Sequence, residues 1–190
     1  MNEGPNELVT TTRQGRLRGL WADGAAAFLG IPYAASPAGE RRFLAPEPPP
    51  SWSGVRDALR YGPTAPQPYR ASTLIPEPTI AGEDYLNLNI FTNGLSRARR
   101  PVLVWIHGGG FFAGGNVSPW FRGTKFAQTG IVLVSINYRL GVEGFLPIEN
   151  APANRGVRDW IAALRWIANN IEAFGGDPTA VTIEIGRAHV

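Results

Sequence analysis

Pro-Val-Leu-Val-Trp-Ile-His-Gly-Gly-Gly-Phe-Phe, from Pro101 to Phe112, is the stretch that decides the fold. The run from Val102 to Ile106 is apolar throughout, which is typical of a strand buried on both faces of a sheet. It ends at His107 and three consecutive glycines. Glycine has no Cβ, so the backbone can turn sharply and bring its N–H groups close to a ligand. Converging N–H groups stabilise the negative oxygen of a tetrahedral acyl intermediate, so the stretch predicts a central strand leading into an oxyanion loop.

Further strand patterns lie on both sides of this stretch. Short runs at 8–12, 16–20 and 26–31 predict an antiparallel meander, and 86–92 and 131–136 predict two more strands. The intervening segment 34–82 is too rich in proline for a helix or a central strand. Because Phe43 and Trp52 lie within it, we expect an ordered loop that wraps over the core.

The clearest helix is predicted at 155–173, with a shorter one at 121–128. Apolar residues recur at helical spacing in the longer segment: Val157, Ile161, Leu164, Ala168, Ile171 and Phe174. Asn154 is the expected N-cap and Gly175 the expected stop. A last strand, 180–183, is expected after a turn at Asp177-Pro178. This alternation of strands and helices predicts an α/β fold with a parallel sheet and right-handed crossovers.

Composition excludes several classes of function. The 190 residues carry a formal net charge of only +3, and the arginines are scattered among acidic residues, so no nucleic-acid partner is expected. There is no cysteine and there are only two histidines, which argues against a disulfide framework, a thiol nucleophile, a metal site or a metal cofactor. The first residues lack a signal-peptide pattern and no stretch reaches membrane-spanning length. We therefore expect a cytoplasmic protein without a membrane partner.

Six segments, in this order along the chain, resemble the type B carboxylesterases, the family of para-nitrobenzyl esterases and cholinesterases. These segments are Phe28 to Ala34, Gly39 to Pro46, Glu83 to Asn89, His107 to Phe111, Asn137 to Phe145, and Asn154 to Pro178. The resemblance implies an incomplete α/β-hydrolase fold, made of an N-terminal meander and the first half of a central, mostly parallel sheet. Residues 1–183 would then be the N-terminal part of a single domain.

The same resemblance implies a carboxylic ester hydrolase that acts on small-molecule esters without a cofactor. Gly109 and Gly110 would be the oxyanion donors, with Gly108 allowing the turn and His107 orienting the loop. In this family the nucleophilic serine lies in a G-x-S-x-G elbow, followed by an acidic residue and then a histidine.

Two ion pairs are also implied by the resemblance. Arg42 with Glu83, and Arg139 with Asp159, would brace loops behind the active site. Tyr85 departs from the family pattern, because many relatives have a disulfide-forming cysteine there. That departure agrees with the cysteine-free composition and with a reducing compartment.

The nucleophile elbow is missing from the sequence. No G-x-S-x-G occurs, and an ungapped overlay on the family puts Arg187 where the serine belongs. Nucleophile, acid and base of the triad are therefore all absent, and we expect this chain to be inactive. We also expect residues 184–190 to be non-native. The codons GAG-ATC-GGA-AGA-GCA-CAC-GTC encode Glu184 to Val190, and after the first base they match the start of a common sequencing adapter.

Three other interpretations stay open at this point. The glycines could form only a tight turn. The fold could belong to a non-catalytic, cholinesterase-like binding domain. Finally, Gly108 to Ala113 satisfies G-x-G-x-x-A, the fingerprint of a dinucleotide-binding oxidoreductase, although Pro119 interrupts the place where the phosphate-binding helix should continue.

Overall fold

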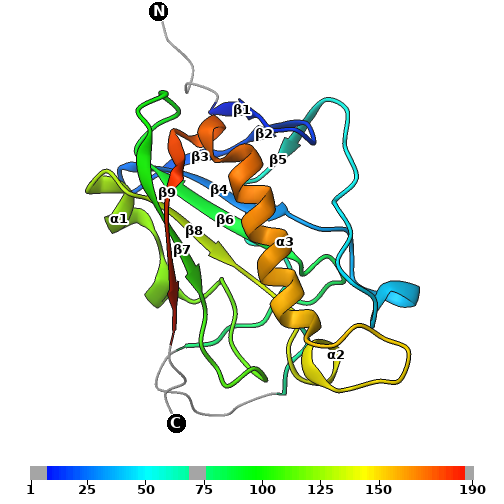
Figure 1. Cartoon of the computed structure of the whole chain (residues 1–190). Coiled ribbons are helices and arrows are strands. Elements are labelled where there is room, and N and C mark those ends of the chain that lie inside the picture. The colour runs from blue at the N-terminus through cyan, green and yellow to red at the C-terminus, as the bar shows by residue number, and fades with distance from the viewer. Residues whose placement is uncertain (1–7, 69–75, 187–190) are drawn as a thin grey trace, which may run out of the picture.

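The computed structural model describes residues 8–68 and 76–186, which form two sheets (Figure 1). The smaller sheet has the order β1-β2-β5, and the larger has the order β3-β4-β6-β8-β7-β9. The strands are β1 (Val9–Thr11), β2 (Arg16–Arg18), β3 (Leu20–Ala22), β4 (Ala25–Pro32), β5 (Val55–Asp57), β6 (Asn87–Thr92), β7 (Arg100–Ile106), β8 (Val132–Ile136) and β9 (Gly176–Ile185).

The large sheet is mixed, with its parallel part around β7. β7 pairs in parallel with β8 on one side and with β9 on the other, so Val102 lies opposite both Val132 and Val181. β6 is antiparallel to β4 and to β8. The prediction of a central apolar strand at 102–106 is confirmed, and β6 joins the antiparallel N-terminal strands to the parallel half of the sheet.

The expected N-terminal meander is divided between the two sheets. The strand predicted at 16–20 breaks at Gly19 into β2 and β3, which belong to different sheets. A Cβ on Gly19 would lie 2.7 Å from the carbonyl oxygen of Ala27. The close approach of these two backbones therefore requires glycine at the crossing point.

The helices are α1 (Thr124–Gln128), α2 (Gly141–Phe145) and α3 (Arg155–Asn170), with 3₁₀ turns η1 (Gly39–Arg41), η2 (Pro119–Phe121) and η3 (Ile171–Phe174). The long predicted helix is confirmed as α3 with η3, and Gly175 ends it with φ 79°. Asn154 is not a side-chain cap: it is left-handed, with φ 53°, and makes no capping hydrogen bond. α2 was not expected from the sequence.

The core lies mainly between the large sheet and α3, which crosses one face of it (Figure 1). β7 and β8 direct Val104, Ile106 and Val134 to this face, where α3 contributes Trp166 and Ile167. A smaller cluster on the opposite face includes Ala127 of α1. α3 therefore fixes the sheet whose central strand carries the glycine loop.

Residues 34–68 of the proline-rich segment wrap over the core as expected, and they contain η1 and β5. Trp52 donates from Nε1 to the carbonyl oxygen of Arg16 at 2.8 Å, which ties the wrap to β2. Towards the other end of the chain, the prediction of a turn at Asp177-Pro178 is wrong. These residues lie inside β9, where the register shift between Arg100 and Val102 of β7 accommodates them.

Candidate active site

The glycine loop begins where β7 ends and has an unusual backbone. Gly109, Gly110 and Phe111 have φ values of 122°, 62° and 67°. The carbonyl oxygen of Gly109 accepts hydrogen bonds from the N–H groups of Phe112 (3.2 Å) and Ala113 (3.1 Å). A Cβ on Gly109 would lie 2.0 Å from the carbonyl oxygen of Ala113, so only glycine fits there. The loop is thus a tight turn closed by its own backbone.

The N–H groups of Gly109 and Gly110 are among the backbone donors that this turn leaves unused. Within residues 8–68 and 76–186, no hydrogen bond employs the N–H of Gly109 or of Gly110. Gly110 is exposed and Gly109 is half-buried. Backbone N–H groups are strong donors, and adjacent ones that are open to a ligand on a constrained loop are suited to binding an anion.

His107 supports the loop from beneath. It is buried, its ring stacks on Tyr138 with centroids 4.5 Å apart, and its Nδ1 lies 2.9 Å from the carbonyl oxygen of Gly108. The Tyr138 hydroxyl donates to the carbonyl oxygen of His107 at 3.1 Å. Burial lowers the pKa of His107 to about 4, so the ring is neutral at pH 7. These contacts fix the ring against the loop.

Gln67 also holds the loop, and the sequence provided no signal for it. Its side-chain amide accepts from the N–H of Gly114 (2.8 Å) and donates to the carbonyl oxygen of the same residue (3.0 Å). A Cβ on Gly114 would lie 2.4 Å from Nδ1 of His107. The proline-rich segment therefore contacts the glycine loop at Gly114, through Gln67.

The end of β9 lies directly against this loop. Gly186 donates from its N–H to the carbonyl oxygen of Ile106 at 2.8 Å, and its Cβ position would be 2.8 Å from the nitrogen of Gly108. Arg187, where the family overlay places the serine, lies outside the described residues.

Of the two implied ion pairs, the structure brings Arg139 and Asp159 together. The side chains are fully buried, with Nη2 to Oδ1 at 2.6 Å and Nε to Oδ2 at 2.9 Å. Arg139 also donates from Nη1 to the carbonyl oxygen of Leu44 at 2.6 Å, which holds the turn after η1. Burial alone would lower the pKa of Arg139, but the hydrogen bonds and charge of Asp159 raise it overall.

The pairing of Arg42 with Glu83 is replaced by another. Arg42 instead places its Nε 3.2 Å from Oε1 of Glu143. The reason is α2, the helix missed from the sequence, because it carries a partly buried carboxylate to this place. The hydroxyl of Tyr85 donates to the other oxygen of Glu143.

Sequence reasoning also missed a fully buried arginine and a set of buried asparagines. Arg155 is 0% exposed and donates to the carbonyl oxygens of Val142, Glu143, Leu146 and Pro152. Asn116 donates its backbone N–H to Oδ1 of Asn137 at 2.8 Å, deep beside the glycine loop. An isolated arginine or asparagine in a sequence has no spacing pattern, so neither could be found from the sequence.

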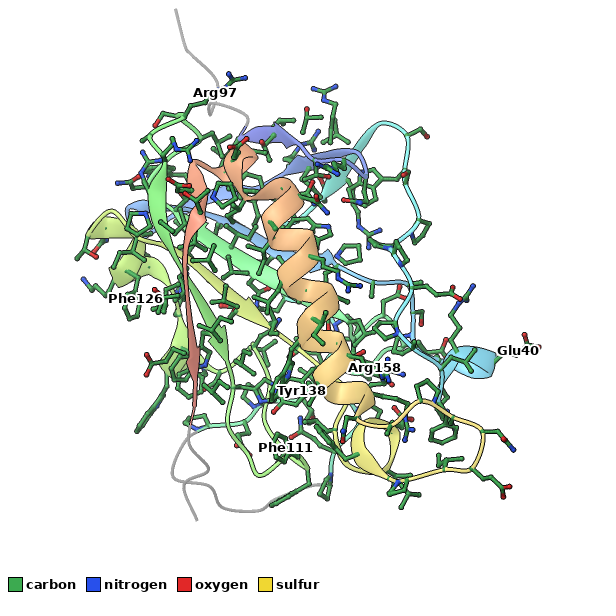
Figure 2. The ribbon with its side chains drawn as sticks, viewed as in Figure 1. Glu40, Arg97, Phe111, Phe126, Tyr138 and Arg158 are labelled. Atoms are coloured by element: carbon green, nitrogen blue, oxygen red, sulfur yellow. The ribbon has the colours of Figure 1, made fainter. Side chains whose placement is uncertain are left out.

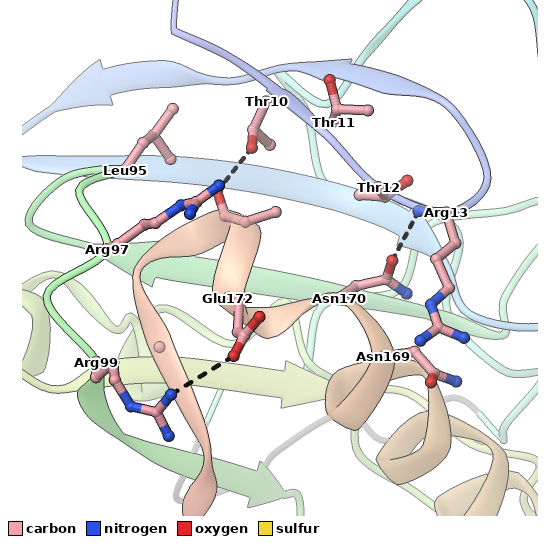
Figure 3. Close-up of a pocket in the computed structure, with 12 residues that line it drawn as sticks. Thr10, Thr11, Thr12, Arg13, Leu95, Arg97, Arg99, Asn169, Asn170 and Glu172 are labelled. Atoms are coloured by element: carbon pink, nitrogen blue, oxygen red, sulfur yellow. Dashed lines mark hydrogen bonds and ion pairs between the residues drawn. The ribbon is translucent and has the colours of Figure 1, made fainter.

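A cavity of about 760 Å³ lies elsewhere, at the amino end of β9 (Figure 3). It is lined by β1, the loop before β7 and the end of α3, and it contains the pair Arg99 and Glu172, whose charged atoms are 3.8 Å apart. Figure 2 shows Arg97, which lines this cavity, at one end of the molecule, and Phe111 of the glycine loop at the other. The cavity is therefore separate from the candidate site.

The described parts of the chain contain neither a membrane-spanning helix nor a cluster of metal ligands. No helix there is both long and apolar enough to cross a bilayer. Among the same residues, no three or more histidine, aspartate or glutamate side chains are grouped to hold a metal ion. The dinucleotide fingerprint is also not followed by a helix: the glycine loop continues through turns to Ser118, so the helix N-terminus that would bind pyrophosphate is missing at that place.

A glycine loop that follows one strand and lies beside the end of a parallel strand is the arrangement of an α/β-hydrolase. Comparison with known proteins identifies the family. The model of the Carboxylesterase family matches residues 6–187, so the chain belongs to that family. It is 42% identical to para-nitrobenzyl esterase of Bacillus subtilis (strain 168) over 92% of this chain and 37% of that protein. It is 45% identical to phenmedipham hydrolase of Pseudarthrobacter oxydans, over 92% of this chain and 36% of that protein.

Solved structures agree with the fold. A carboxylesterase of Geobacillus stearothermophilus, at 48% identity, superposes with a TM-score of 0.85 over 94% of this chain and 37% of that chain. The α/β-hydrolase fold expected from the sequence is thus confirmed in its partial form. The chain spans little more than a third of the length of the relatives it matches.

Proposed function

We propose that the whole protein containing this chain is a serine carboxylic ester hydrolase, and that this chain supplies its oxyanion hole. The observation that carries the proposal is the pair of unused N–H groups on Gly109 and Gly110, next to the point where β9 ends. In the family, the serine that follows this strand attacks the ester carbonyl, and the loop receives the negative charge that develops on the carbonyl oxygen.

The roles of the chain's residues follow from their contacts. Gly109 and Gly110 would donate to the oxyanion, which is most valuable in the transition state because the charge exists only there. His107 would not be the catalytic base, since it is buried, burial lowers its pKa to about 4 and makes it a weak base, and its Nδ1 contacts the carbonyl oxygen of Gly108. The base and the acid would come from sequence beyond this chain, so the chain by itself should be inactive.

The substrate class would be small-molecule carboxylic esters, in keeping with the para-nitrobenzyl esterase among its relatives. Residues 1–183 would form the N-terminal part of a single hydrolase domain. Tyr85, in place of the cysteine common in the family, and the absence of cysteine from these 190 residues support a reducing, cytoplasmic location.

The test is hydrolysis of para-nitrophenyl acetate by the whole protein, with and without a serine-directed organophosphate. We expect saturable hydrolysis that the organophosphate abolishes, with one phosphoryl adduct per chain by mass spectrometry. Saturable binding of an ester without hydrolysis and without an adduct would refute the proposal and favour the non-catalytic binding domain.

A further inference from the structure

Glu143 is held between two side chains that lie far from it in the sequence. The Tyr85 hydroxyl donates to one carboxylate oxygen, and Nε of Arg42 lies 3.2 Å from the other. Tyr85 is 3% exposed, and the side chain of Glu143 is 19% exposed. A partly buried carboxylate with both oxygens engaged is fixed in position, which an exposed ion pair on a flexible side chain is not.

Glu143 is part of α2, and α2 touches the glycine loop. The N–H of Gly141, at the start of α2, donates to the carbonyl oxygen of Phe111 at 2.7 Å. The ring of Phe145, at the end of α2, packs on the ring of Phe111 with centroids 4.6 Å apart. Both ends of this helix therefore contact the residue that directly follows Gly110.

Phe111 needs such support because of its backbone conformation. Its φ of 67° lies in the left-handed region, which is strained for a bulky residue such as phenylalanine. The strain persists only where neighbouring contacts hold the residue in place. If Phe111 relaxed, the N–H of Phe112 would move away from the carbonyl oxygen of Gly109. The N–H of Gly110 belongs to the same peptide as that oxygen, so it would lose one of the hydrogen bonds that fix its direction.

α2 cannot supply this support without its own anchors. It has only five residues, which is too short for a helix to be stable without tertiary contacts. Arg155 holds the backbone of α2 and of its C-cap by donating to the carbonyl oxygens of Glu143 and Leu146, each at 2.7 Å. Glu143 is the polar side chain of α2, and it connects the helix to Arg42, just after η1, and to Tyr85, just before β6.

We propose that Glu143, clamped by Tyr85 and Arg42, is a positioning residue that fixes α2 and, through Phe111, the direction of the oxyanion donors. The catalytic meaning of this role rests on the proposed function.

The test uses the whole protein with three variants: Tyr85→Phe, Glu143→Gln and the double substitution. Glu149→Gln is the matched control. It removes the same charge as Glu143→Gln, but from an exposed residue shortly after α2. Rates are divided by the number of active sites titrated with organophosphate, so that loss of folded protein does not count. We expect kcat to fall about tenfold with KM changed less than about twofold, because displacement by a fraction of an ångström weakens an interaction made in the transition state.

The double variant should lose no more than the more severe single variant, because both changes break one clamp. Amide hydrogen exchange supplies a second readout that needs no activity. The N–H groups of Gly141 and Ala113 should exchange at least about tenfold faster in both single variants and at the wild-type rate in Glu149→Gln.

The two readouts separate failure of this inference from failure of the proposed function. If the wild-type protein hydrolyses esters and both variants keep kcat within twofold, the positioning role is refuted whatever the exchange rates are. If the wild-type protein hydrolyses no ester, the proposed function is wrong, and unchanged exchange at Gly141 and Ala113 would refute the clamp as well.

Discussion

Replacing Gly109 with alanine should damage the site far more than the same change at Gly130, although both glycines have positive φ. Gly109 has φ 122°, and an added Cβ would lie 2.0 Å from the carbonyl oxygen of Ala113. Real Cβ contacts are essentially never shorter than 3.0 Å, so the two backbone segments must separate by about 1 Å. Gly130 has φ 87° and nothing within 4 Å of its Cβ position, so it reports the cost of positive φ alone.

The magnitude follows from what the separation breaks. Moving Ala113 removes the hydrogen bond from its N–H to the carbonyl oxygen of Gly109, and this bond closes the turn that aims the donors. Losing one oxyanion donor costs about 2.7–4 kcal/mol of transition-state stabilisation, or roughly 10²- to 10³-fold in kcat. Gly130→Ala should leave kcat unchanged and cost about 1–2 kcal/mol of stability.

The assay is steady-state hydrolysis of para-nitrophenyl acetate by the whole protein, normalised by active-site titration. Gly109→Ala should lower kcat at least about 10²-fold with little change in KM, because the donors act on charge that appears only in the transition state. Equal kcat values for the Gly109→Ala and Gly130→Ala variants would refute the reasoning, since the glycine would then serve only the turn.

Three further predictions concern the chain and its buried charges. The 190-residue chain without any nucleophile should hydrolyse para-nitrophenyl acetate about 10⁶-fold more slowly than the whole enzyme, and a saturable burst would contradict this. Asp159→Asn leaves Arg139 buried without a counter-charge and should destabilise the whole protein by about 3 kcal/mol or more in urea unfolding; a loss below about 1 kcal/mol would disprove it. Burial lowers the pKa of His107 to about 4 in the folded protein. As the pH falls below about 6.5, the unfolded state therefore binds the proton first, and about 3 kcal/mol of stability should be lost by pH 4. His107→Gln should flatten that part of the stability–pH curve, and an unchanged curve would exclude His107 as its cause.

Sequence periodicity was sufficient for the elements whose burial is simple. β7 is apolar because one of its faces is buried and the other is partly covered, and α3 shows a stripe because only one of its faces packs on the core. Gly175 could be predicted as a helix stop because its left-handed conformation is local. The glycine loop could also be located, since three glycines after a buried strand have few uses.

Long-range polar contacts could not be predicted in the same way. Whether Arg42 meets Glu83 or Glu143 depends on where α2 packs, and five residues with two glycines carry no helical pattern. Asn154 has the chemistry of an N-cap, but its backbone is left-handed, so its side chain does not reach the helix N–H groups. Gln67 contacts Gly114 across 47 positions of sequence, and no local signal connects the two.

The central claim is that the N–H groups of Gly109 and Gly110 form the oxyanion hole of an esterase. A crystal structure of the whole protein with a trifluoromethyl ketone bound to its serine tests this claim most directly, because the hemiketal oxygen stands where the oxyanion develops. We expect that oxygen to lie about 2.7–3.1 Å from the nitrogen atoms of both glycines. A hemiketal oxygen that points away from the loop, with both nitrogen atoms beyond about 3.5 Å, would contradict the account.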